Sequence, residues 1–142
     1  MDVTRSQASD LADGMYTGKS HLLTGAAWDR TLGWLINKNN KTIVQVAGDS
    51  REWVNYSDDE FSNTTGRVNT GIFSQTNAMG IYDLAGNVCE WTSEIGPNSS
   101  YPFVLRGGSY NHTGSLQPTF IRAVSEESYT HVSYGFRVAL FL

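Results

Sequence analysis

The side chains with the most versatile chemistry are scarce in this chain, which has one cysteine, Cys89, and three histidines, His21, His112 and His131. A thiolate is a redox-active nucleophile and a soft metal ligand, but a single thiol has no intramolecular partner. We therefore expect Cys89 to be a small buried apolar residue. A metal site at His112 and His131 would need a third ligand, so these two are predicted to be surface contacts. His21 is expected to make a structural hydrogen bond.

A segment near the C-terminus fits neither a core element nor an ordinary loop. Asn111–Ser133 (NHTGSLQPTFIRAVSEESYTHVS) mixes apolar and aromatic residues with polar ones. A core segment should show a period of 3.6 or 2 residues, and this one shows neither. A polar loop should not contain so many apolar side chains. We interpret the segment as a binding face, in which aromatic anchors stand beside adaptable polar groups.

Three blocks carry a resemblance to a known family. They are Asn77–Trp91 (NAMGIYDLAGNVCEW), Arg106–Tyr110 (RGGSY) and Tyr134–Leu140 (YGFRVAL). Their order and spacing resemble the formylglycine-generating-enzyme (sulfatase-modifying-factor) family, a branch of the C-type-lectin-like fold, across roughly the second half of the chain. The resemblance implies an α+β fold of one domain over residues 1–142. In that fold, two helices pack on small antiparallel sheets with long irregular loops.

The same resemblance argues against enzymatic activity. Active members carry a cysteine pair shortly after the RGGS block, where copper and the oxidation chemistry are located, but the matching Ser109–Arg122 has no cysteine. The related ergothioneine-type sulfoxide synthases take iron-binding histidines from a separate helical domain, for which this chain has no room. We predict a non-enzymatic protein that requires no cofactor. A formylglycine-type oxidase is the enzymatic alternative, and an inactive structural module of a larger surface protein is the other.

Residues 111–133 also resemble the variable region of diversity-generating-retroelement proteins, which display a mutagenised ligand-binding face on this fold. The resemblance implies a binding or display protein of a bacterial surface or phage particle, with a protein or another surface molecule as its partner. Arg122 matches a fixed arginine of such regions and is expected to bridge carbonyls or a carboxylate. An ordinary irregular loop is the alternative. The expected ligand contacts are Asn111, His112, Thr113, Leu116, Gln117, Thr119, Phe120, Ile121, Val124, Glu126, Glu127, Tyr129 and His131.

A calcium site is a further implication of the family resemblance. The matching positions are the carboxylates of Asp83 and Glu90 and the carbonyls of Gly86 and Val88, hard oxygen ligands of the kind that Ca²⁺ takes. The alternative, which we favour, is that Asp83 caps the turn and Glu90 pairs with an arginine such as Arg106 or Arg137.

Composition restricts the remaining classes. A length of 142 residues predicts one domain. The net charge is −4 and no basic cluster is present, which argues against a nucleic-acid partner. No apolar run approaches the roughly 18–20 residues that span a bilayer, and the first residues do not resemble a signal peptide. Because the family fold normally begins with strands before its first helix, we expect either a trimmed piece or part of a larger protein.

Local patterns predict the elements. Thr4 and Gln7 have the spacing of a capping box before a short helix, and Thr24 precedes a second helix whose apolar residues recur at helical spacing. Lys41–Ala47 is β-branched and is predicted to be a strand, as are 104–107 and 135–142, where Phe136, Val138 and Leu140 would share a face. Residues 48–76 are predicted to be an irregular insert pinned by Trp53, Tyr56, Phe61 and Phe73.

Overall fold

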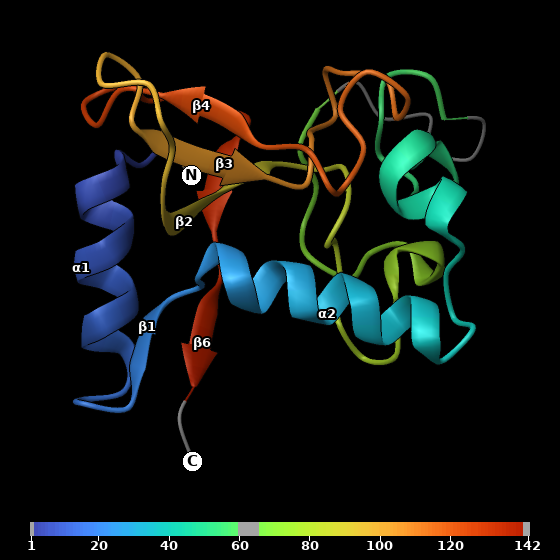
Figure 1. Ribbon diagram of the computed structural model, residues 1–142, viewed down its shortest axis with the longest axis horizontal. Coiled ribbons are helices and arrows are strands. Elements are labelled where there is room, and N and C mark those ends of the chain that lie inside the picture. Colours follow the sequence, from blue (N-terminus) through green and yellow to red (C-terminus); the bar gives the residue numbers. More distant parts are fainter. Residues whose placement is uncertain (1, 60–65, 141–142) are drawn as a thin grey trace.

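The computed structural model describes residues 2–59 and 66–140. In Figure 1, helices α1 (Arg5–Met15) and α2 (Gly25–Asn37) lie beside small sheets and a large region made mostly of loops. Helix α1 and helix α2 precede the irregular region, and the larger sheet is built mostly from the second half of the chain. The elements are α1 (Arg5–Met15), β1 (Ser20–Leu22), α2 (Gly25–Asn37), β2 (Cys89–Ile95), β3 (Phe103–Arg106), β4 (Ala123–Ser125), β5 (Tyr134–Phe136) and β6 (Val138–Leu140).

Both predicted helices are confirmed, together with their starts. The hydroxyl of Thr4 accepts from the backbone N–H of Gln7, and the Gln7 side chain accepts from the backbone N–H of Thr4, so the capping box closes. Thr24 caps α2 by accepting from the N–H of Ala27. Each helix buries one face, because its small or apolar residues recur every three or four positions.

The larger sheet has the order β4-β3-β2-β5, and β1 pairs with β6 in a sheet of two strands. The β1–β6, β2–β3 and β3–β4 pairs are antiparallel, as expected. Strand β5 departs from the expectation because it lies parallel to β2. A parallel neighbour requires a long connection, and here the chain between β2 and β5 includes β3 and the segment 111–133, within which Ala123–Ser125 forms β4.

Residues 135–142 were predicted to form one continuous strand, and this prediction is wrong. The chain divides at Arg137, so that β5 joins the larger sheet and β6 joins β1. The Arg137 side chain bonds Glu90 of β2 at the division, while its carbonyl accepts from the N–H of Leu23. Phe136 and Val138 are partly buried against the core, whereas Leu140 is exposed.

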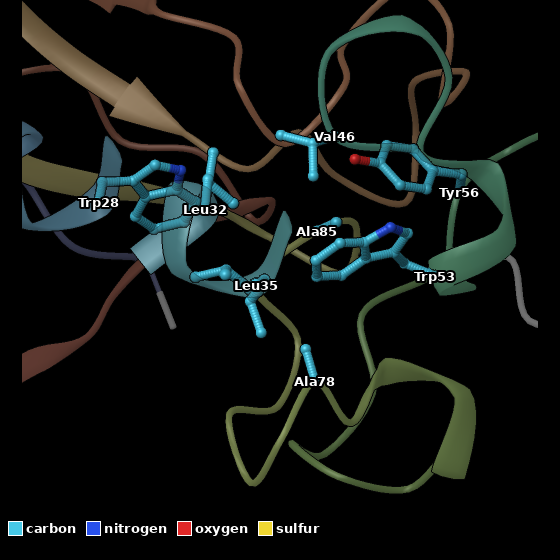
Figure 2. Close-up of a cluster of buried hydrophobic side chains, with 9 residues drawn as sticks. Trp28, Leu32, Leu35, Val46, Trp53, Tyr56, Ala78 and Ala85 are labelled. Carbon is cyan, nitrogen blue, oxygen red and sulfur yellow. The ribbon is translucent and has the colours of Figure 1, made fainter. Parts of the chain in front are cut away.

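Two apolar cores hold the molecule together. One lies between α1, β1, β2 and β3, where Trp91 is fully buried and donates its indole N–H to the carbonyl of Val3. The other lies between α2 and the irregular region, and Figure 2 shows Trp53 and Tyr56 on one side with Trp28 and other α2 side chains opposite. The second core explains how residues 49–59 hold a fixed path with only one short 3₁₀ turn, Arg51–Trp53, as regular structure.

The insert is therefore pinned by aromatic residues as predicted at Trp53 and Tyr56, which are buried. Phe61 lies outside the described residues. The predicted strand Lys41–Ala47 is wrong, because Val44–Gly48 forms a π-helical turn. The hydroxyl of Thr42 accepts from the N–H of Gln45, and the Gln45 side chain accepts from the N–H of Thr42, so local capping outweighs the strand preference of β-branched residues.

Among the residues that the structure describes, no helix is long and apolar enough to cross a membrane.

Candidate binding face

The segment 111–133 is fixed to the rest of the fold at a few points. The backbone N–H of Gly114 donates to Asp58 and its carbonyl accepts from Ser50. A Cβ on Gly114 would lie 2.2 Å from the backbone N of Arg51, so only glycine fits. The N–H of Phe120 donates to the carbonyl of Val46. These bonds lay the first half of the segment along residues 46–58.

Thr119 is the most firmly held residue of the segment, and it corrects the list of expected ligand contacts. Its side chain is fully buried, its hydroxyl donates to the carbonyl of Leu84 at 2.6 Å, and its N–H donates to Ser50. Its carbonyl accepts from the indole N–H of Trp28. A side chain so placed cannot face a ligand, so Thr119 belongs to the scaffold.

Most of the apolar candidates in the segment are exposed instead of packed. Leu116 is 68% exposed, Phe120 is 45% exposed and Tyr129 is 44% exposed. Val124 is exposed to the same extent as Tyr129, and Ile121 is half-buried. The predicted exposure is confirmed for Leu116, Phe120 and Tyr129. Of the polar candidates, Asn111, Glu126 and Glu127 are exposed, while His112, Thr113, Gln117 and His131 are half-buried.

The aromatic residues among the expected ligand contacts fall into two groups, according to the side chains that their rings contact. Phe120 lies beside Arg106 and Arg122, each with its guanidinium carbon 5.7 Å from the ring centre. Tyr129 stacks on His131 at 6.5 Å between ring centres, and both contact the ring of Tyr134, at 5.7 and 5.8 Å. That all candidates form one surface stays a prediction.

A network of charges underlies Phe120. Arg106 is buried and pairs with Asp29 and with Glu94 at 3.3 Å. Arg122 pairs with the same two carboxylates, at 2.7 Å to Asp29 and 2.6 Å to Glu94. The prediction that Arg122 bridges a carboxylate is confirmed. Asp29 and Glu94 were not predicted, because their roles depend on how the start of α2 meets the end of β2.

Both histidines of the segment are tied to buried serines. His112 Nδ1 lies 2.8 Å from the hydroxyl of Ser109, and His131 Nδ1 lies 2.7 Å from that of Ser133. Burial lowers the pKa of His112, and the charge of His131 lowers it further. Within the described part of the chain, no cluster of three or more His, Cys, Asp or Glu side chains is arranged to hold a metal. His21 makes the expected structural contact, with Nδ1 at 3.4 Å from the carbonyl of Ala139.

Cys89 is buried, as predicted, and its environment suppresses thiolate chemistry. Burial raises the pKa of its thiol to about 12. The sulfur lies 3.7 Å from the side-chain oxygen of Gln117, a weak bond that connects β2 to the segment. A thiol that stays protonated at neutral pH is a poor nucleophile.

In the family block around Gly86, the carboxylate of Glu90 forms an ion pair. Both carboxylate oxygens of Glu90 accept from the guanidinium of Arg137, and the Asp83 carboxylate accepts from the N–H of Gly71 at 3.0 Å. The predicted pairing of Glu90 with an arginine is therefore confirmed for Arg137. Calcium binding by Asp83, Glu90 and the carbonyls of Gly86 and Val88 stays an untested hypothesis.

This arrangement of two helices, two small sheets and long pinned loops is a C-type-lectin-like fold. A sequence model of the Sulfatase-modifying factor enzyme 1-like domain matches residues 45–141, well over half of the chain. The chain belongs to this family. No curated protein matches the sequence.

Three solved structures share the fold. Treponema denticola variable protein 1 is 23% identical with a TM-score of 0.58, over 85% of this chain and 47% of its own. CarF is 24% identical with a TM-score of 0.65, over 86% of this chain and 47% of its own. PvdO from Pseudomonas aeruginosa is 19% identical with a TM-score of 0.69, over 99% of this chain and 60% of its own. The chain thus spans about half the length of these proteins, and identities this low establish the fold alone.

Proposed function

We propose that this chain is a non-enzymatic ligand-binding module whose ligand-facing surface, within residues 111–133, is diversified by a retroelement. The observation that carries the proposal is the pattern of exposure in the segment. Leu116, Phe120 and Tyr129 point to solvent beside residues that are buried and fully bonded, such as Thr119. Exposed aromatic and apolar groups on a rigid support are the usual composition of a binding face.

The match in fold to a protein named as a variable protein supports the proposal. The chemistry of the site supports it too, since Cys89 is buried and protonated and Ser109–Arg122 contains no cysteine. The partner that we propose is a protein or another surface molecule, met on a bacterial cell surface or a phage particle. Calcium, if bound, would have a structural role near Asp83.

Sequencing the locus across a population tests the proposal. We expect substitutions to concentrate at exposed positions such as Leu116, Phe120 and Glu127, with Thr119 and Arg122 nearly constant. A reverse-transcriptase gene and a near-identical template repeat should lie close to the gene. An even spread of substitutions and no such neighbours would favour a structural module of a larger surface protein.

The enzymatic alternative has its own assay. Incubation with copper and a sulfatase-motif peptide should leave the peptide unchanged, because no cysteine pair is available to carry the oxidation. Measurable conversion would reverse the ranking in favour of a formylglycine-type oxidase.

A further inference from the structure

Among the residues that the structure describes, part of the backbone of strand β5 has no partner at the edge of the larger sheet. The N–H of Cys89 donates to the carbonyl of Ser133 at 2.8 Å, and Cys89 lies opposite Tyr134 in the parallel register. In a parallel pair with this register, Gly135 directs its N–H and C=O toward β2, while Tyr134 and Phe136 direct theirs away. The N–H of Tyr134 turns back to the carbonyl of His131. No described residue bonds the Tyr134 carbonyl or the N–H and C=O of Phe136.

The residues of this edge, 134–137, are among those that line a pocket of about 480 Å³. Residues 67–70, Asp83, Asn87 and Glu90 line it as well. We name this pocket the β5 groove. Gly135 keeps it open, because a Cβ at that position would already lie 2.9 Å from the Val88 side chain and larger side chains would fill the space. Its volume lies within the roughly 300–1,000 Å³ of ordinary ligand pockets.

The groove adjoins one end of the binding face. The ring of Tyr134, which lines the groove, contacts the rings of Tyr129 and His131. Arg67, which also lines the groove, donates to the carbonyl of Val132 at 3.3 Å. A partner that covers Tyr129 and His131 therefore also reaches the mouth of the groove.

The charges of the groove fit a neutral polar occupant. Arg137 is neutralised by Glu90, and Arg67 lies 3.6 Å from Asp2, so neither sign dominates. What the groove offers is one backbone donor and two backbone acceptors along a strand edge, beside partly exposed aromatic rings. Another stretch of backbone supplies the complementary donors and acceptors.

We propose that the β5 groove binds an extended peptide segment of the protein partner, which adds as a strand to the free edge of β5. The inference rests on the proposed function and specifies that the partner is a protein. Backbone pairing does not depend on the partner's side chains. The groove would thus supply affinity that stays constant while the exposed residues of 111–133 change and set specificity.

Peptide selection tests the inference. A display library of random linear eight-residue peptides is selected on the folded chain, and the enriched peptides are measured by fluorescence anisotropy. Thr70→Trp places a large ring in the groove from an exposed position, and we expect binding to weaken about tenfold or more, the effect of losing one good contact. Thr17→Trp, at an exposed position that does not line the groove, is the matched control and should bind like the parent. Thermal melts check that both variants fold.

Backbone pairing leaves a second signature. Methylation of single peptide amides should weaken binding at every second position, because alternate residues of an added strand pair with the edge. Binding should also slow hydrogen exchange of the Phe136 amide. The absence of enriched peptides, or peptides that bind Thr70→Trp as tightly as the parent, would overturn the inference. If peptide binding is instead lost only in Leu116→Ala and Phe120→Ala, the assignment of the peptide site to the β5 groove is wrong and the proposed binding face stands.

Discussion

Replacing Thr119 by valine should distinguish the scaffold from the binding face within the segment 111–133. Valine keeps the shape of the side chain but removes its hydroxyl, which donates to the Leu84 carbonyl at 2.6 Å in a fully buried setting. A buried acceptor that loses its donor costs about 1–3 kcal/mol. At about 4 °C per kcal/mol for a domain of this size, the melting temperature should fall by roughly 4–12 °C.

Thermal melts followed by circular dichroism, with urea unfolding as a second measure, give both quantities. Thr130→Val is the matched control, since Thr130 is exposed in the same segment and makes no hydrogen bond within the described residues. It should change the unfolding free energy by no more than about 0.5 kcal/mol. Equal stability of the two variants would refute the assignment of Thr119 to the scaffold.

Four further predictions follow from the same contacts. Trp91→Ala should lower the free energy of unfolding in urea titrations by about 3–5 kcal/mol, as for other buried aromatics. Leu116→Ala should change the free energy of unfolding by less than about 0.5 kcal/mol. Similar costs for the two variants would mean that the segment 111–133 is part of the core. Arg106→Ala should destabilise by about 1.5–3 kcal/mol, because it removes the buried partner of two carboxylates that keep Arg122 as their other partner. A loss under about 0.5 kcal/mol would show that the network is only a surface feature. The pKa of His112 is lowered in the folded state, so the unfolded chain takes up the proton first and stability falls as pH drops below about 6.5. The melting temperature of His112→Gln should therefore fall less between neutral pH and pH 5 than that of the parent. An identical fall would contradict the reasoning. Roughly 5 mM calcium, enough for weak sites, should not raise the melting temperature, and a rise that Asp83→Asn abolishes would establish the calcium site instead.

The parts that could be predicted from sequence are those that neighbouring residues decide. The cap of α1 involves Thr4 and Gln7, three positions apart, and it forms as the pattern indicates. The need of Trp91 for a polar partner was equally predictable, but the partner itself, the carbonyl of Val3, lies 88 positions away and depends on how α1 packs. Likewise, Glu90 had two candidate arginines. Both lie near Trp28, at 5.8 Å for Arg106 and 5.5 Å for Arg137, and in the fold Glu90 pairs with Arg137 while Arg106 pairs with Asp29 and Glu94.

The missing period of the segment 111–133 has a physical explanation in its anchors. Gly114, Thr119 and Arg122 are each fixed by a different part of the fold, namely the insert, the family block with α2, and the ends of α2 and β2. Residues held at points set by distant elements need no repeat of 2 or 3.6, because no single neighbouring surface covers one side of them. Between the anchors, residues such as Leu116 and Phe120 contribute little to the fold and face solvent. We expect such a segment to tolerate substitutions between its anchors without losing its path, as the proposed diversified binding face requires.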